Sequence, residues 1–186
     1  MKKVLLLTTG GTIASRPTEE GLAPGLDGGG MAARLYGLTD SYALTVRDLL
    51  SMDSSNIQPE EWQVIARAVY ESRGDFDGIV ITHGTDTMAY TASVLSFMLL
   101  GVPIPVVLTG AQLPMTHPLS DGMENLRTAL AMAASGVAGV FLAFDRKVIL
   151  GCRAVKTRTT DFDAFESVNW PLAATVDGKG LHVRLE

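Results

Sequence analysis

The sequence of 186 residues has very few cysteine, histidine and aromatic side chains. Its one cysteine, Cys152, cannot form an internal disulfide, and zinc sites built on cysteine need several such ligands. The three histidines are scattered without the spacing of metal ligands, so the sequence predicts no metal site. The fold must therefore be held together by packing, and a hydrophobic content of 47% is enough for a globular core.

Clusters of basic residues and long apolar runs are also missing. The net charge is −5, and without clustered Lys or Arg the chain is not expected to bind nucleic acid or anionic membranes. The longest apolar stretch, "VLSFMLLGVPIPVVL", is broken by Gly101, Pro103 and Pro105. The opening "MKKVLLL" has a shorter apolar run than the roughly 7–15 residues of a signal peptide, and a strand is predicted there. We expect a cytoplasmic protein whose partners are small molecules or proteins.

Short apolar runs alternate with segments of helical periodicity. Strands are predicted at 4–7, 44–49, 78–82, 104–109 and 139–144, and helices at 59–72, 86–100 and 121–135. Strands that are apolar throughout are typical of a parallel sheet covered on both sides. The sequence therefore predicts an α/β fold over 1–186, a single domain with a doubly wound, mostly parallel sheet, helices on both faces and right-handed crossovers.

Two segments depart from this alternation. Residues 15–41 are rich in Gly, Pro and charge, and such a long excursion is predicted to be a lid-like loop. Residues 161–186 lose the clear pattern, although "DGKG" at 177–180 is typical of a short hairpin turn.

Four predicted strands run directly into small polar residues. These clusters are "TTGGT" at 8–12, "MDSSN" at 52–56, "THGTDT" at 82–87 and "TGAQ" at 109–112. The carboxyl ends of parallel strands gather on one edge of a sheet, where such folds bind ligands. Turns and helix caps also use these residue types, so any single cluster could be structural. Four together favour a binding site.

The first cluster does not have the spacing of a phosphate-binding loop. It matches neither G-x-G-x-x-G nor G-x-x-x-x-G-K-[ST]. Gly10 and Gly11 instead allow a tight turn in which backbone N–H groups face a ligand and the hydroxyl of Thr12 lies beside them. This arrangement suits a nucleophile next to an oxyanion hole.

Further groups of the site are expected in two other segments. Thr85 and Asp86 lie at the start of the second predicted helix, where the alternative role of Asp86 is an N-cap. His83 is expected to pack and hydrogen-bond beneath its loop rather than to act as a base. A threonine nucleophile needs a base, and Lys156 is the candidate if it lies in a partly dry pocket; the alternative is an exposed surface lysine.

Six sequence blocks together resemble the bacterial-type L-asparaginases in their order and approximate spacing. They are "TGGTIA" (9–14), "MDSSN" (52–56), "ITHGTDTM" (81–88), "LTGAQ" (108–112), "SDGMENL" (120–126) and "VKTRTTD" (155–161). The similarity covers about 160 residues, and "MDSS" and "SDG" are closer to the cytoplasmic branch than to the secreted one.

The resemblance implies hydrolysis of L-asparagine to L-aspartate and ammonia, without a metal or organic cofactor. It implies that Thr12 is the nucleophile and that Thr85, Lys156 and Asp86 form a second hydroxyl–lysine–carboxylate group. Substrate would be held by residues that bind its α-groups and its amide: Ser54, Ser55, Asp86 and the Ala111 backbone. Whether asparagine or glutamine is preferred stays open, because one methylene separates them.

Two departures from the family pattern are visible. The tyrosine usual in the family's lid is replaced by Leu22 in "GLAP", and Tyr36 is a candidate substitute. The family's smaller C-terminal domain would follow at about residue 186, and in the family that domain of a neighbouring subunit completes the active site. We therefore expect a homo-oligomer, and weak or no hydrolysis by this chain alone.

Two other functions stay open. An asparaginase-like subunit of a tRNA-dependent amidotransferase would normally carry an extra domain before the "TGGT" block, which here starts within ten residues of Met1. A non-catalytic amino-acid-binding module is favoured by Leu22 and by the missing C-terminal domain.

Overall fold

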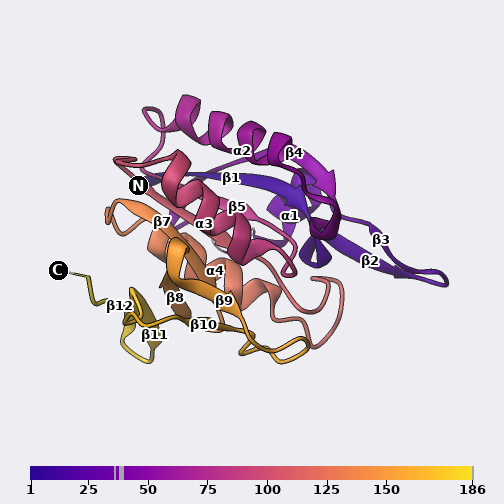
Figure 1. Cartoon of the computed structure of the whole chain (residues 1–186). Coiled ribbons are helices and arrows are strands. Elements are labelled where there is room, and N and C mark those ends of the chain that lie inside the picture. The colour runs from indigo at the N-terminus through magenta and orange to yellow at the C-terminus, as the bar shows by residue number, and fades with distance from the viewer. Residues whose placement is uncertain (36, 38–39, 186) are drawn as a thin grey trace.

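The computed structural model describes residues 1–35, 37 and 40–185 and is built around an eight-stranded sheet (Figure 1). The strand order is β12-β11-β8-β7-β6-β5-β1-β4. The strands run over Lys2–Gly10 (β1), Tyr42–Met52 (β4), Gly78–Thr82 (β5), Pro105–Thr109 (β6), Gly139–Phe144 (β7), Lys147–Leu150 (β8), Ala174–Asp177 (β11) and Gly180–Val183 (β12). Strands β4, β1, β5, β6 and β7 are parallel, and β8, β11 and β12 extend the sheet antiparallel.

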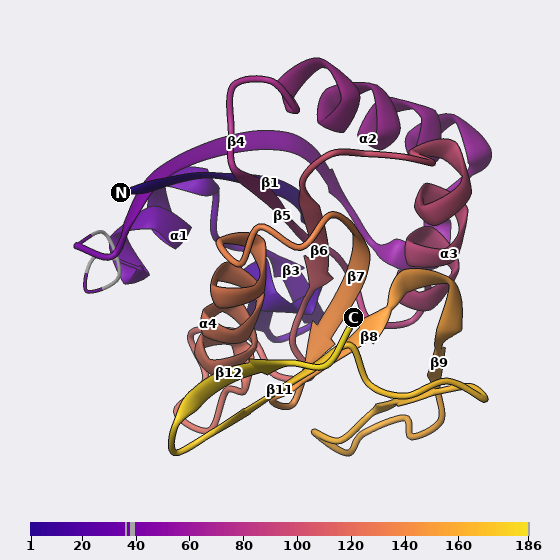
Figure 2. The ribbon, with the colours of Figure 1, turned by 90° about the vertical axis from the view of Figure 1, so that its left-hand side faces the viewer.

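Helices cover both faces of this sheet. The four α-helices are α1 (Gly28–Arg34), α2 (Pro59–Ser72), α3 (Met88–Met98) and α4 (Gly122–Ala133) among the described residues. Figure 2 shows α1 and α4 on one side of the sheet and α2 and α3 on the other. Alternate residues of β1 pack on opposite faces of the sheet. Val4 and Leu6 belong to the core under α1 and α4, and Leu5 and Leu7 belong to the core under α2 and α3. The predicted α/β class is confirmed.

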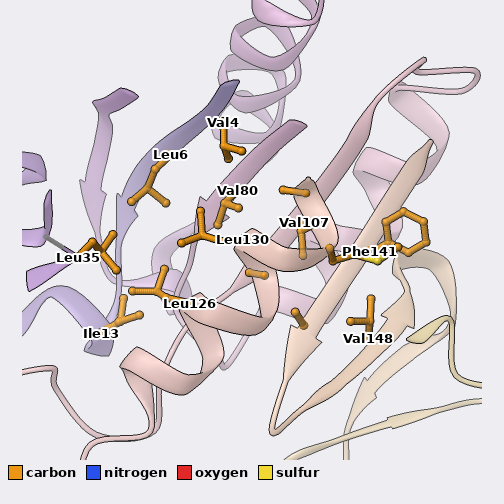
Figure 3. Packing of buried hydrophobic residues seen from close by; sticks show 14 of the residues in the cluster. Val4, Leu6, Ile13, Leu35, Val80, Val107, Leu126, Leu130, Phe141 and Val148 are labelled. Carbon is orange, nitrogen blue, oxygen red and sulfur yellow. The ribbon is translucent and has the colours of Figure 1, made fainter. Parts of the chain in front are cut away.

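The core beneath α4 shows how the apolar runs are used. Val80 and Val107 point from adjacent parallel strands toward Leu126 and Leu130 of α4 (Figure 3). All four side chains are fully buried. Burial of this kind on each face of the parallel strands explains why their sequences are apolar throughout.

Helix α2 has the predicted bounds because its first turn carries strong local signals. Pro59 occupies the first turn, and the Gln58 backbone N–H donates to the Glu61 carboxylate at 2.6 Å in a capping box. Helices α3 and α4 are shorter than predicted. Helix α3 begins at Met88, two residues after the predicted start, because Asp86 belongs to the turn before the helix.

One connection in the sheet breaks the predicted handedness. Connections β5–α3–β6 and β6–α4–β7 advance in the same direction across the sheet, but α3 and α4 lie on opposite faces. Two such connections must have opposite hands, so the prediction that every crossover is right-handed is wrong. The segment 110–121 passes across the carboxyl edge of the sheet, where the Met115 N–H donates to the Ile13 carbonyl at 3.2 Å.

The two segments outside the strand–helix alternation are also ordered into elements. Residues 15–34 contain a hairpin, β2 (Ser15–Thr18) and β3 (Gly21–Pro24), which projects from the body of the molecule in Figure 1, and then α1. The predicted "DGKG" turn is confirmed, since Asp177 pairs with Gly180 between β11 and β12. A further two-stranded sheet joins β9 (Ala154–Lys156) to β10 (Phe165–Ser167). No helix of the described residues is long and apolar enough to cross a bilayer.

Candidate active site

The candidate site lies where the central strands β1 and β5 end side by side. Thr8 pairs with Thr82 in the parallel register, so the segments that follow them start from the same edge of the sheet. The chain leaves β1 toward the face of α1 and leaves β5 toward the face of α3. Such a point of divergence opens a crevice at the carboxyl ends of the strands, which is where doubly wound sheets bind ligands.

A double-glycine turn ends β1 and is required by its surroundings. Gly10 and Gly11 have φ angles of 97° and 86°, in the left-handed region that side chains disfavour. A β-carbon on Gly10 would lie 2.5 Å from the Met52 carbonyl oxygen, and one on Gly11 would lie 2.6 Å from the Gly84 amide nitrogen. The turn therefore packs directly against the ends of β4 and β5, and the next residue is Thr12.

A cavity of about 1020 Å³ opens above these turns. It is lined by residues from every strand end that the sequence singled out: Thr12, Ser54, Thr85, Asp86, Gln112 and Lys156. The hairpin β2–β3 and the start of α1 form another wall, through residues 22–27 and Gly30. The segments that follow β1, β4, β5, β6 and β9 thus meet around one space.

Lys156 connects the two polar residues that follow β5. Its ammonium nitrogen lies 2.9 Å from Thr85 Oγ1 and 3.0 Å from Asp86 Oδ1. The Lys156 side chain is 15% exposed, whereas that of Asp86 is 67% exposed. Lys156 is therefore not a free surface lysine. Asp86 is not the N-cap of α3, because Thr87 occupies that position.

The predicted substrate-binding residues are placed less uniformly. Ser54 is buried and lines the cavity. Ser55 is exposed and does not line the cavity, and its hydroxyl and backbone N–H both donate to Asp53 Oδ1 at 2.9 Å. Ala111 is 1% exposed and lies just before Gln112, which does line the cavity. Ser54 is thus the one of these three whose side chain the fold brings to the cavity.

His83 is buried beneath the turn, as predicted. Its Nδ1 lies 2.8 Å from the Gly84 carbonyl oxygen, so Nδ1 must carry the hydrogen. Its Nε2 lies 2.9 Å from the Thr91 hydroxyl, which also accepts a hydrogen bond of 2.8 Å from the Trp62 indole. Burial lowers the pKa of His83 below its ordinary value. The ring is neutral and supports the Gly84–Asp86 turn.

A family model described as "Asparaginase, N-terminal" matches residues 3–186. The chain belongs to the asparaginase family. It is 50% identical over 184 residues to an L-asparaginase of Thermococcus kodakarensis, covering 98% of this chain and 56% of the relative. It is 39% identical over 190 residues to L-asparaginase 1 of Escherichia coli strain K12, covering 98% of this chain and 55% of the relative.

Another relative and a solved structure extend this comparison. The chain is 35% identical to one of the subunits of the glutamyl-tRNA(Gln) amidotransferase of Thermoplasma acidophilum, over 95% of this chain and 45% of the relative. The structure of the thermostable L-asparaginase from Thermococcus kodakarensis superposes with a TM-score of 0.90 at 49% identity, covering 99% of this chain and 56% of that one. The chain spans about half the length of the curated relatives it matches.

Leu22, the residue that the resemblance aligns with a lid tyrosine, belongs to the hairpin beside the cavity. Leu22 lies in β3, is 56% exposed and lines the cavity. Tyr36, the candidate substitute, lies outside the described residues. Among the residues that the structure does describe, no group of three or more His, Cys, Asp or Glu could hold a metal ion.

Sequence reasoning missed the polar residues that shape the loop after β6 of this asparaginase-family chain. Asp121 is 8% exposed and accepts hydrogen bonds from the Gln112 and Leu113 backbone N–H groups at 3.0 and 3.1 Å. Asn125 is 1% exposed; its amide donates to the Gly110 carbonyl at 2.9 Å and accepts from the Asp145 N–H at 2.9 Å. A carboxylate at the start of an amphipathic helix and an asparagine on its apolar side are a signal that could have found them.

Proposed function

We propose that the protein containing this chain hydrolyses L-asparagine to L-aspartate and ammonia, and that Thr12, Thr85, Asp86 and Lys156 carry the reaction. The observation behind this proposal is the contact of Lys156 with both Thr85 and Asp86 at the wall of the cavity that Thr12 also lines. Hydroxyl, ammonium and carboxylate groups in contact form an arrangement suited to moving a proton to or from an amide.

In the proposed reaction the Thr12 oxygen attacks the side-chain amide carbon. The C–O bond forms, the C–N bond breaks, and the Thr12 hydroxyl proton leaves with the amine as ammonia. Water then hydrolyses the resulting aspartyl ester and restores the Thr12 hydroxyl. Backbone N–H groups of the glycine turn and of Thr85 would stabilise the negative charge on the carbonyl oxygen.

The α-ammonium group of the substrate needs a hydrogen-bond acceptor, and its α-carboxylate needs hydrogen-bond donors. Asp86, whose carboxylate is mostly exposed in the cavity wall, would accept hydrogen bonds from the α-ammonium group. Hydroxyl and backbone N–H donors of Ser54 and Ser55 would bind the α-carboxylate, and the Ala111 backbone would lie beside the amide. The Ser55 hydroxyl and backbone N–H both donate to Asp53 Oδ1 at 2.9 Å, so both would have to leave Asp53 to bind the α-carboxylate.

The proposal extends to the protein as a whole. We take residues 1–186 to form a single domain in which 15–41 covers the site, and we propose a cytoplasmic homo-oligomer whose neighbouring subunits complete each site. The isolated chain is then a weak enzyme or an inactive one.

A second candidate, ammonia production within a tRNA-dependent amidotransferase, is favoured by the relatives named as glutamyl-tRNA(Gln) amidotransferase subunits. The third candidate is a non-catalytic amino-acid-binding module.

Ammonia release by the full-length protein separates these functions. We expect asparagine alone to be a substrate, without tRNA or a partner protein, and Thr12→Ala to abolish turnover while aspartate still binds. Thr45→Ala, an exposed position on β4, is the matched control and should behave as the parent. Release that needs tRNA would indicate the amidotransferase, and aspartate binding without release by the parent would indicate a binding module.

A further inference from the structure

Gln112 holds three segments of the cavity wall together, although neither the proposed reaction nor the substrate contacts use it. Its backbone N–H donates to both carboxylate oxygens of Asp121 at 3.0 Å. Its side chain extends into the wall of the cavity beside Thr85 and Thr159. The residue is therefore fixed at its backbone before its amide makes any contact.

The orientation of the Gln112 amide is set by its partners. Nε2 lies 3.0 Å from the Thr159 carbonyl oxygen and 2.9 Å from the Asp161 carbonyl oxygen. A carbonyl can only accept, so both hydrogens of the amide nitrogen are used there. Oε1 must consequently face Thr85 Oγ1, which lies 3.3 Å away.

This orientation determines where the Thr85 hydrogen points. An amide oxygen is an acceptor only, so Thr85 must donate its hydrogen to Gln112. The same Thr85 oxygen accepts from the Lys156 ammonium group at 2.9 Å. The Thr85 hydroxyl is thus held between one acceptor and one donor, with its hydrogen directed away from Lys156.

We propose that Gln112 is a positioning residue with two separable roles, an inference that rests on the proposed amide hydrolysis. Its amide oxygen orients the Thr85 hydroxyl for the chemical step. Its amide N–H groups hold the backbone of residues 159–161 against the site and keep Lys156 enclosed. Gln112 does not touch the groups proposed to bind the substrate's α-carboxylate and α-ammonium.

Two substitutions in the full-length protein separate these roles. Gln112→Met removes the acceptor and both donors at similar length, and Gln112→Glu keeps an oxygen but removes both donors. We expect kcat for ammonia release to fall about a hundredfold in Gln112→Met with KM within about threefold. Gln112→Glu should recover about tenfold of that loss. Gln63→Met, on the exposed side of α2, is the matched control and should leave both constants unchanged.

The second role has a readout that does not need turnover. Acetylation of Lys156 by an amine-reactive ester, followed by peptide mass spectrometry, is compared with that of exposed Lys179 in the same molecule. We expect Lys156 to react about tenfold faster in Gln112→Met, because the two hydrogen bonds that anchor the backbone after Lys156 are lost. Thermal unfolding and aspartate binding confirm that each variant is folded.

Several outcomes would overturn the proposal. These are a kcat of folded Gln112→Met within threefold of the parent, a KM that rises as kcat falls, no recovery in Gln112→Glu, or unchanged acetylation of Lys156. A parent protein that releases no ammonia would instead remove the proposed hydrolysis. The acetylation experiment would still decide whether Gln112 encloses Lys156.

Discussion

The backbone of Gly11 lies against the backbone of Gly84, so that a β-carbon on Gly11 would come within 2.6 Å of the Gly84 amide nitrogen. Gly84 is equally confined, since a β-carbon added to it would lie 2.3 Å from Ser54 Oγ. The glycine turn after β1, the turn after β5 and Ser54 are therefore stacked without room for a methyl group. The positions of Thr12 and Thr85 follow from this contact.

Gly11→Ala should separate the two turns. The positive φ of 86° at Gly11 and the overlap with Gly84 together are expected to lower the free energy of unfolding by about 2–4 kcal/mol. The proposed asparagine hydrolysis by the full-length protein should slow by at least about a hundredfold. Gly21→Ala is the control: φ is 125°, but nothing lies within 4 Å of the added carbon. Urea unfolding that gave equal losses for both variants would contradict the role of the contact.

Lys156→Met should affect activity far more than stability. Its partner Asp86 is 67% exposed, so we expect the pair to contribute less than about 1 kcal/mol to folding. Loss of the ammonium group beside Thr85 is expected to lower kcat roughly 10²- to 10⁴-fold. Lys179→Met, in the exposed turn between β11 and β12, should retain parental kcat. A thermal midpoint that falls as steeply as activity would show a structural role instead.

His83 should make stability depend on pH. Burial lowers its pKa in the folded protein, so the unfolded chain binds the proton first as the pH falls. The free energy of unfolding is then at its full value above the unfolded pKa of about 6.5 and falls below it, by up to about 1.4 kcal/mol per pH unit. His83→Gln should lack this contribution to the slope between pH 6.5 and 5.

The control for this pH dependence is His182→Gln in β12, where the imidazole is 42% exposed and hydrogen-bonds to Asp177. Urea unfolding at several pH values gives the slope for each protein. If His83→Gln kept the slope of the parent, the buried neutral ring would not be its source.

Asp121→Asn should loosen the loop after β6. The carboxylate accepts from the backbone N–H groups of Gln112 and Leu113, and an amide in its place loses one acceptor oxygen. We expect a loss of about 1–3 kcal/mol in the free energy of unfolding. Hydrogen exchange at the Gln112 and Leu113 amides should speed up more than elsewhere. Asp75→Asn, in an exposed turn, is the control and should change neither quantity.

Local patterns in the sequence were sufficient for the parallel part of the sheet and for the ends of some elements, but not for strand β8. The apolar runs predicted all five parallel strands. In β1, β5, β6 and β7 burial on both faces leaves few polar residues, whereas the edge strand β4 has no buried residue and a weaker pattern. The bounds of Pro59–Ser72 were predicted correctly because proline and the capping glutamate mark its start. Strand ends rich in Ser, Thr and Gly pointed to the edge of the sheet where the cavity lies.

The features that could not be predicted depend on contacts between distant residues. The hand of the β6–α4–β7 connection is decided by which face α4 covers, and its amphipathic pattern fits either face. Gln112 meets Thr159 and Asp161, residues 47 and 49 positions away, so nothing in "TGAQ" distinguishes it from a surface glutamine. Ser55 was expected beside the substrate, but an Asx-type bond to its neighbour Asp53 occupies its hydroxyl.

The chain of hydrogen bonds from Trp62 through Thr91 and His83 to the Gly84 carbonyl gives the molecule a built-in optical probe. The indole of Trp62 donates to Thr91, Thr91 donates to His83 Nε2, and His83 Nδ1 donates to the Gly84 carbonyl. The indole N–H is therefore coupled to the tautomer of the His83 ring, which contacts the turn that contains Thr85. The other tryptophan, Trp170, is 47% exposed, and a collisional quencher in solution would suppress its emission first. The remaining emission from Trp62 would follow, in real time and without a label, any ligand that shifts the turn at Gly84.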